Sequence, residues 1–463
     1  MYPKLLSNQG SHAVVIGGSM AGLVTGRVLT KHFDTVTIIE RDRFPDEPIP
    51  RQGVPQSHHN HVLLMRGAMI LEELFPGLQA QLCAVGASQL DMAKDTVWLN
   101  PAGWGIRFNS GITMLASSRS LLEWGVRQQL MQCPQIRFVA ESEVTSLLAS
   151  ADNTAITGVQ VRSRQSYPGS SEQQILADLV VDASGRISKT PQWLITLGYK
   201  APQETVINSH VGYASRIYQL PANVARDWQA LYVQAVPPDV TRMGLMLPIE
   251  GGYWLVSLGG GDRDYPPTDE AGFLEFARTL RSSILYDAIK DAKPLSPIVS
   301  YRATENRRRH YEKLHRMPEG LIVTGDAACA FNPVYGQGMT TAAIAAETLD
   351  QCLKQGLSGL GKRFQTQLAQ VNAIPWTLAT SEDYRYRGTE GKSPDQKTKL
   401  MHWYMDRLML LSTKNIEVRS QFLQVMHMLK TPTALFHPKI VALVFKEALQ
   451  SSRHQATLAT KGT

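Results

Sequence analysis

The chain opens with short runs of consecutive apolar residues rather than alternating ones. The run at 12–16 (HAVVI) predicts a buried parallel strand, followed by a helix to about residue 32 and a second buried strand at 36–39 (VTII). Strands covered on both faces need no polar positions, so this pattern favours a parallel sheet enclosed by helices. The three elements form a βαβ unit of about 30 residues, the size of a dinucleotide-binding unit.

The hydrophobic pattern changes twice further along the chain. The runs 179–182 (LVVD) and 320–324 (GLIVT) predict two more buried strands, whereas 209–260 alternates, is rich in aromatic residues and predicts a mixed β-sheet. Beyond residue 354 the pattern is mainly helical. We therefore expect an α/β protein with a Rossmann-like, discontinuous nucleotide-binding lobe (1–80, 110–205 and 300–353), a mixed-sheet substrate domain (81–109 and 206–299) and a helical C-terminal region (354–463).

Composition narrows the class of protein. With 463 residues, 43% of them apolar and 19% charged, the chain is neither disordered nor fibrous. The four cysteines show no metal-ligand spacing and suit free thiols in a reducing compartment. Residues 1–11 do not resemble a signal peptide, and no apolar run reaches the roughly 18 residues of a membrane span. We expect a cytoplasmic protein without a transmembrane segment.

The net charge of +7 is unevenly distributed. Residues 354–463 hold 16 Lys and Arg against 7 Asp and Glu. We interpret this excess as a solvated helical face, with attraction of an anionic partner or membrane surface as the alternative. No nucleic-acid-binding motif accompanies the charge, so a nucleic-acid partner is not expected.

A glycine-rich turn follows the first strand. Gly17, Ser19 and Gly22 occupy the three positions of the G-x-G-x-x-G turn, which brings a diphosphate onto the free N–H groups of the next helix. Glu40 ends the second strand, where a carboxylate can accept hydrogen bonds from ribose hydroxyls. Strand, helix, second strand and acid in this order predict nucleotide binding.

A second constellation indicates that the nucleotide is FAD. Asp326 follows the strand at 320–324, and Pro333-Val-Tyr-Gly336-Gln-Gly338 then leads into a long helix. Such a loop presents bare backbone N–H groups and a helix N-terminus, which suit the ring edge that becomes negative when a flavin is reduced.

Together these motifs resemble a known family. The turn with Glu40, the pair Ser118-Arg119 and the segment 325–339 are similar to class A flavin monooxygenases of the para-hydroxybenzoate hydroxylase fold, over about residues 12–350. The stretches 51–56 (RQGVPQ) and 331–336 (FNPVYG) further resemble FAD-dependent epoxidases of polyether biosynthesis, of the lasalocid epoxidase type.

The resemblance implies roles for individual residues. Glu40 would hold the adenosine ribose, Arg119 the ribityl–diphosphate region, and Asp326 the ribityl chain. His61 and Tyr335 would lie near the flavin. The full set of implied cofactor contacts is Gly17, Ser19, Met20, Ala21, Gly22, Glu40, Arg41, Arg51, Val54, Arg119, Asp182, Gly185, Asp326, Pro333, Gly336, Gly338 and Met339.

The same resemblance implies an oxygenase that uses O2 through a flavin C4a-hydroperoxide and acts on a small lipophilic molecule. Epoxidation of an alkene in a natural-product intermediate needs no strong protein base, in keeping with the lack of an obvious acid–base pair. A substrate wall is expected from the 209–260 sheet, with simple core packing as the alternative role. Its expected members are Tyr213, Arg216, Met246 and Trp254.

One departure from the family concerns the electron source. Class A hydroxylases carry a D-G motif linked to NADPH handling, and here Ser184 stands in place of its Asp, in the segment Asp182-Ala-Ser-Gly185-Arg186. We therefore expect either loosely coupled NAD(P)H use or a separate flavin reductase. The alternative interpretation is an ordinary turn that ends the strand.

Other functions remain open at this stage. They are aromatic hydroxylation on the same fold, and a reductase or cyclase that uses FAD without O2. A halogenase is disfavoured because its G-W-x-W-x-I-P signature is replaced by Gly103-Trp104-Gly-Ile-Arg. His59-x-His61 lies on a loop without a carboxylate at ligand spacing, so no metal site is predicted.

Overall fold

The first layer of the molecule is a parallel sheet, as the apolar runs predict. In the computed structural model, which describes residues 10–164, 172–221 and 226–461 and side chains up to residue 450, five strands lie in the order β20-β11-β1-β2-β7. All neighbours in this sheet pair in parallel. The strands are β1 (Gly10–Ile16), β2 (Phe33–Ile39), β7 (Ile136–Val139), β11 (Leu179–Asp182) and β20 (Leu321–Val323).

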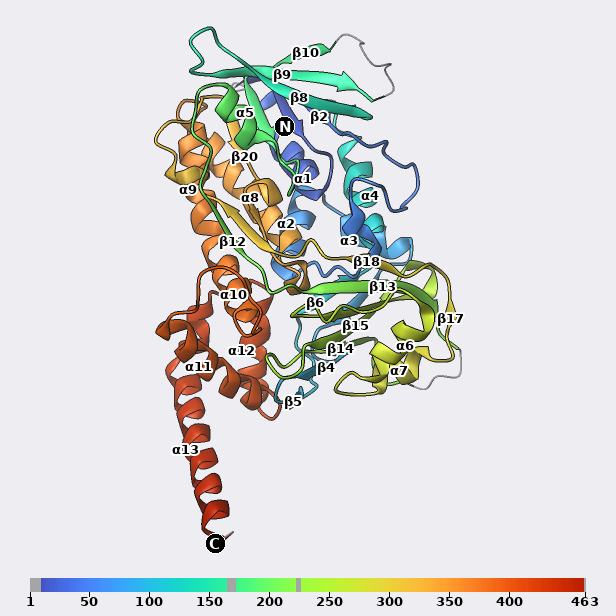
Figure 1. Ribbon diagram of the computed structural model, residues 1–463. Helices are drawn as coiled ribbons and strands as arrows, with labels where there is room; N and C mark the ends of the chain where they lie inside the picture. Colours follow the sequence, from blue (N-terminus) through green and yellow to red (C-terminus); the bar gives the residue numbers. More distant parts are fainter. Residues whose placement is uncertain (1–9, 165–171, 222–225, 462–463) are drawn as a thin grey trace, which may run out of the picture.

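Helices enclose this sheet and complete the first lobe (Figure 1). The strand interiors are fully buried, for example Val15, Val36 and Val180 at 0% exposure, so continuous apolar runs were required here. A three-stranded antiparallel sheet of β8 (Ser142–Ala149), β9 (Ile156–Ser163) and β10 (Gln173–Leu176) caps one end. The helices of the lobe are α1 (Met20–Leu29), α2 (Met65–Leu74), α3 (Leu78–Ala84), α4 (Arg119–Leu130), α5 (Thr190–Thr196), α8 (Gly338–Leu353) and α9 (Leu360–Val371).

A mixed eight-stranded sheet forms the second lobe. Its order is β17-β13-β16-β15-β14-β4-β5, with β18 paired to β13. One face packs on α6 (Glu270–Arg278) and α7 (Ile284–Ile289), and the other face turns toward the first lobe. The strands are β4 (Thr96–Asn100), β5 (Gly103–Trp104), β13 (Gly212–Gln219), β14 (Ala230–Val233), β15 (Arg242–Ile249), β16 (Tyr253–Gly260), β17 (Lys293–Pro294) and β18 (Val299–Tyr301).

Two small sheets connect the lobes. The pair β3–β6 lies beside the mixed sheet, and β12-β19-β21 runs between the lobes. These strands are β3 (Ser88–Asp91), β6 (Thr113–Ala116), β12 (Glu204–Ile207), β19 (Asn306–Arg309) and β21 (Cys329–Ala330).

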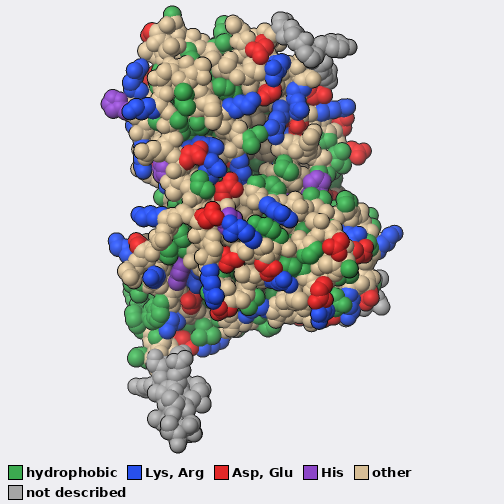
Figure 2. All heavy atoms as spheres, in the orientation of Figure 1, with side chains coloured by type: hydrophobic (Ala, Val, Ile, Leu, Met, Phe, Trp, Pro, Cys, Tyr) green, Lys and Arg blue, Asp and Glu red, His purple; other side chains and the backbone are tan. Residues whose placement is uncertain are grey.

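The C-terminal region is helical, as expected. It consists of α10 (Ala373–Asp383), α11 (Gln396–Ser412), α12 (Ile416–Met426) and α13 (Pro438–Lys461), the last of which projects away from the body in Figure 1. Trp98 of β4 is buried in one core with α11 and α12, so this region is anchored to the mixed sheet. Basic and acidic side chains are interspersed on the face shown in Figure 2. Within the described residues, no helix has the length and apolarity needed to span a membrane.

Candidate functional site

The turn after β1 can be built only from glycine at two of its positions. Gly17 has a φ of +104°, and a Cβ there would lie 2.6 Å from the Ala183 carbonyl oxygen. A Cβ on Gly22 would lie 1.8 Å from the Gly17 carbonyl oxygen. Ser19 is the N-cap residue of α1, so the first free N–H groups of the helix follow directly after the turn.

Three turns from distant parts of the chain meet at one edge of the parallel sheet. Ile16 pairs with Asp182, and Asp182 with Val323, so the carboxyl ends of β1, β11 and β20 lie side by side. A Cβ on Gly325 would lie 2.7 Å from the Ala21 Cβ, which places the turn after β20 directly against the first turn of α1. Segments 300 residues apart in sequence therefore form one site, at the sheet edge where open α/β folds bind their ligands.

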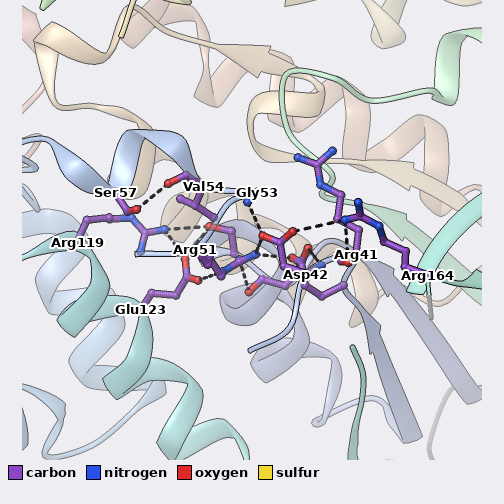
Figure 3. A network of polar contacts seen from close by, with 12 residues as sticks. Arg41, Asp42, Arg51, Gly53, Val54, Ser57, Arg119, Glu123 and Arg164 are labelled. Atoms are coloured by element: carbon purple, nitrogen blue, oxygen red, sulfur yellow. Dashed lines mark hydrogen bonds and ion pairs between the residues drawn. The ribbon is translucent and has the colours of Figure 1, made fainter. Parts of the chain in front are cut away.

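Glu40 lies at this edge and is held by several donors, next to the network of Asp42, Arg51 and Glu123 shown in Figure 3. Its carboxylate accepts hydrogen bonds from the Gly18 N–H at 2.8 Å and the Asp42 N–H at 3.1 Å. Arg51 lies 3.2 Å from the same carboxylate and also bonds to Asp42 and Glu123. Burial disfavours the charge on Arg51, but Glu123 and Glu40 outweigh it and raise the Arg51 pKa.

A second arginine completes this polar network. Arg119 begins α4 and is 4% exposed, and its Nη2 donates to Ser19 Oγ at 2.9 Å and Glu123 Oε2 at 2.8 Å. Its Nη1 is buried and has no hydrogen-bond partner among the residues that the structure describes. Burial works to raise the pKa of Glu123, but Arg119 and Arg51 outweigh it and keep that pKa below its ordinary value. The unpartnered guanidinium nitrogen, next to a helix N-terminus, suits an anionic group such as a diphosphate.

The loop before α8 presents a second helix N-terminus. Pro333–Tyr335 form a single 3₁₀ turn, and Gly336 then takes the left-handed conformation at φ +65°. Gly338 begins α8, and a Cβ there would meet no atom within 4 Å. Asp326 is partly buried, which raises its pKa, and Arg186 lies 3.8 Å from its carboxylate. The helix start therefore faces open space.

Two histidines lie between the lobes in neutral forms. His61 Nδ1 lies 2.9 Å from the His59 carbonyl oxygen, which only accepts, so the His61 proton is on Nδ1. His59 Nδ1 lies 2.8 Å from Ser215 Oγ, and its Nε2 is buried without a partner. Burial lowers the pKa of His59 to about 3 and that of His61 to about 4. Neither side chain carries a charge at neutral pH.

A hydrogen-bond chain fixes the tautomer of His59. The Asn60 N–H donates to Ser257 Oγ at 3.3 Å, and Ser257 Oγ lies 2.5 Å from Ser215 Oγ. Asn60 Nδ2 donates to the same oxygen at 3.1 Å, so both lone pairs of Ser257 Oγ are occupied and its proton is donated to Ser215, which in turn donates to His59 Nδ1. The His59 proton is therefore on Nε2, next to the rings of Tyr213 and Tyr301.

The four residues expected to form one substrate wall do not share a face of the mixed sheet. Tyr213 packs against His59, on the face turned to the first lobe. Met246 and Trp254 are buried with α6 and α7 on the opposite face, and Arg216 stacks over Tyr218 there. Side chains alternate along a strand, so 213 and 216 point to opposite faces. The expected wall needs correction: Ser215, Leu245 and Ser257 accompany Tyr213 on the lobe-facing side.

Asp182 also needs correction as a cofactor contact. It is fully buried, and its carboxylate accepts from the Ser184 N–H at 2.9 Å, Ser184 Oγ at 2.5 Å and Thr190 Oγ1 at 2.6 Å. A bond from Ser188 Oγ adds to these. Both oxygens are therefore occupied by its own loop, and the residue shapes the turn that Gly185, at φ +83°, continues.

The other residues expected near the cofactor differ in their burial and in their hydrogen bonds. Met20 is buried in the core, and Met339 packs against it. Val54 is buried and accepts a bond from Ser57 Oγ at 2.7 Å, whereas Arg41 is exposed and its carbonyl oxygen accepts from Arg164 (Figure 3). The hydroxyl of Tyr335 donates a hydrogen bond to Asp383 Oδ1 at 2.6 Å.

Two residues at this site were not predicted from the sequence. They are Arg186, which bonds to the Glu305 and Phe331 carbonyl oxygens, and Asp383 of α10. The signal for Arg186 was its place in the turn after β11, but nothing local marks Asp383. Its contacts lie 48 to 77 residues away in the sequence.

Comparison with known proteins shows the family of the chain. Residues 11–368 match the model of the FAD binding domain family. The chain belongs to this family. The chain is also similar to Protein Rv3254 of Mycobacterium tuberculosis (strain ATCC 25618 / H37Rv). The two are 35% identical over 378 residues, which are 80% of this chain and 78% of the relative.

Two solved structures show the family fold. The flavin-dependent brominase Bmp2 has a TM-score of 0.67 at 14% identity, over 96% of this chain and 100% of that one. The p-nitrophenol 4-monooxygenase PnpA of Pseudomonas putida DLL-E4 has a TM-score of 0.64 at 16% identity, over 89% of this chain and 96% of that one. The fold class predicted from the sequence is thus confirmed. Membership of the FAD binding domain family supports FAD as the cofactor.

The residues at the sheet edge fit FAD on their own chemistry. A buried Arg119 Nη1, unpartnered within the described residues, lies beside the N-terminus of α1 and suits the diphosphate, and Gly17 and Gly22 allow the turn to pack tightly against Ala183 and the start of α1. The open space before Gly338 lies at the start of α8. The diphosphate and the ring of an extended FAD would each meet a helix N-terminus in this arrangement.

Proposed function

We propose that this protein is an FAD-dependent monooxygenase that transfers one oxygen atom from O2 to a small lipophilic molecule, with epoxidation of an alkene as its reaction. The observation that supports this proposal is the meeting of the Gly17 turn, the Asp326 turn and the start of α8 at one edge of the sheet. The lobe-facing side of the mixed sheet carries Tyr213 and His59 toward the same region.

In this proposal, residues of the first lobe bind and orient the cofactor. Glu40 would accept from the adenosine ribose, Arg119 and Arg51 would hold the diphosphate, and Asp326 would bind the ribityl chain. The N-terminus of α8, over Gly336–Met339, would lie against the ring edge that gains negative charge on reduction. When bound and reduced, FAD supplies the activation of O2 and the transferred oxygen atom.

The substrate side supports epoxidation over phenol hydroxylation. A phenol hydroxylase uses a base that removes the phenolic proton, and His59 and His61 have pKa values lowered by burial to about 3 and about 4. Burial also raises the pKa of Tyr213 far above neutrality. These groups orient a ligand and exclude water, and they are poor bases at neutral pH.

The electron source is proposed to be NAD(P)H used with loose coupling, or a separate flavin reductase. Ser184 donates to Asp182 through both its N–H and its hydroxyl, so the turn after β11 is closed on itself. A cofactor-handling acid is not available at position 184. The two electron sources predict different kinetics. If a separate reductase supplies the electrons, the purified protein alone should oxidise NAD(P)H slowly, whereas direct use of NAD(P)H needs no second protein.

The test begins with the purified protein. It should bind FAD and show flavin absorbance, and with reduced flavin, ¹⁸O2 and a panel of lipophilic alkenes it should form products that carry one ¹⁸O atom. Anaerobic turnover would point to a reductase or cyclase, and ¹⁸O on an aromatic ring would point to a hydroxylase. Comparing NADPH alone with NADPH plus a flavin reductase identifies the electron donor.

A further inference from the structure

A carboxylate from the C-terminal region lies against the loop that precedes α8. Asp383 ends α10 and has 0% exposure. Tyr335 Oη donates to its Oδ1 at 2.6 Å, and Asn332 Nδ2 donates to the same oxygen at 3.1 Å. Asn306 Nδ2 donates to Oδ2 at 2.6 Å. Three side chains from two segments thus converge on one buried group.

The orientation of these donors is fixed by the backbone. Asn306 Oδ1 accepts from the Asn332 N–H at 2.7 Å, so its amide nitrogen must face Asp383. Asn332 Oδ1 accepts from the Val334 N–H at 3.2 Å and caps the 3₁₀ turn, so its amide nitrogen also faces Asp383. Only a group that accepts at both oxygens, an ionised carboxylate, satisfies all three donors.

We propose that Asp383 is a positioning residue for the flavin. Through Tyr335, Asn332 and Asn306 it holds Pro333–Gly338 in the conformation that presents the N-terminus of α8 to the ring. This inference rests on the proposed function. It makes α10, outside the family match at 11–368, part of the cofactor site.

A purely structural role is a poor explanation for this carboxylate. A buried charge costs stability, and well-packed apolar groups of similar size often serve as well or better. The cost is visible in the Asp383 pKa, which burial raises to about 6 against the lowering effect of the Tyr335 hydrogen bond. What the charge provides is one defined loop conformation.

The test separates the two ends of the cofactor. Apoprotein of the wild type and of Asp383→Asn is titrated with FAD and with ADP, which lacks the ribityl chain and the ring. The amide places a donor against a donor, so the variant should bind ADP as the wild type does. Its FAD affinity should fall about tenfold, the loss expected for one hydrogen bond to a charged group. The midpoint potential of bound FAD should also shift.

Two further variants complete the design. Tyr335→Phe removes one donor, keeps the carboxylate, and should show the same split between FAD and ADP. Asp350→Asn is the matched control, because Asp350 pairs with His32 and Lys354 near the other end of α8. It should leave both affinities and the potential unchanged.

The possible outcomes are distinct. Unchanged FAD affinity and potential in Asp383→Asn and Tyr335→Phe would overturn the inference, as would an equal loss of FAD and ADP binding in both. A wild-type protein that binds ADP but no FAD would overturn the proposed function itself, and the inference with it.

Discussion

At the residue scale, Asp383 gives the protein a specific pH dependence. Burial raises its pKa to about 6, so the folded state holds this proton more tightly than the unfolded state between about pH 4 and pH 6. Its contribution to the free energy of unfolding is therefore largest below pH 4 and is lost as the pH rises through 6. The full difference is about 3 kcal/mol, from about 1.4 kcal/mol per pKa unit.

The measurement is urea unfolding of the wild type and Asp383→Asn at pH 4.5, 6 and 7.5. Other carboxylates, such as Glu143, have lowered pKa values and act in the opposite direction, but they are common to both proteins and cancel in the difference. The stability of the wild type relative to the variant should fall with rising pH. A difference that is constant over this range would show that Asp383 has no raised pKa.

Arg419 is a second buried charge with an unusual environment. It is 1% exposed, its Nε and Nη2 have no partner, and its guanidinium lies 5.6 Å from the centre of the Trp98 ring. Burial alone lowers its pKa to about 10. Since no carboxylate within the described part of the chain pairs with this charge, Arg419→Met should raise the free energy of unfolding by about 1 to 3 kcal/mol.

Chemical denaturation at neutral pH measures this effect. Arg419→Ala serves as the control, because it removes the same charge but leaves a cavity and should lose stability. If Arg419→Met is less stable than the wild type by more than 1 kcal/mol, the guanidinium is stabilising and the argument from its lack of partners is wrong.

At the element scale, α8 allows binding and folding to be separated. Gly338 is the first residue of this helix, its φ is ordinary, and a Cβ would meet nothing within 4 Å. Gly338→Ala should therefore leave the melting temperature of the apoprotein unchanged or slightly higher, because alanine favours the helix. If the ring lies at this helix start, the methyl group should weaken FAD binding at least about tenfold.

Gly22→Ala provides the contrast, since its Cβ would collide with the Gly17 carbonyl oxygen and should lower the melting temperature as well. Differential scanning fluorimetry and FAD titration distinguish the two patterns. Full FAD affinity in Gly338→Ala would place the ring elsewhere.

Individual strands also show which parts of the fold could be predicted from the sequence. The buried strands β1, β11 and β20 were predictable, because unbroken apolar runs fit only a sheet covered on both faces. The expected wall joined Tyr213 and Arg216, although positions 213 and 216 of one strand point to opposite faces. The alternation in β13 also could not show which face turns to the first lobe. That depends on the contact between His59 and Ser215, 156 residues apart.

At the scale of the whole molecule, the site is assembled from three regions that a local pattern cannot connect. The Gly17 turn and the loop before α8 each have their own motif, and both were predicted as nucleotide contacts. Asp383 belongs to a region whose sequence predicts only that it is helical, and its role follows from the packing of α10 against β19 and the loop. Binding of the flavin ring at the loop before α8 should therefore change the stability of α10 in the C-terminal region.

Hydrogen–deuterium exchange measures this coupling in the intact protein. ADP should slow exchange in the Gly17 turn and the start of α1, where its diphosphate would lie. FAD should slow exchange there and also in Pro333–Gly338 and the end of α10, because the ring stabilises the loop and the loop is bonded to Asp383. In Asp383→Asn, FAD should still protect the loop, but protection of α10 should be lost. If FAD protects only the Gly17 turn, or protects α10 equally in both proteins, the C-terminal region does not take part in holding the cofactor.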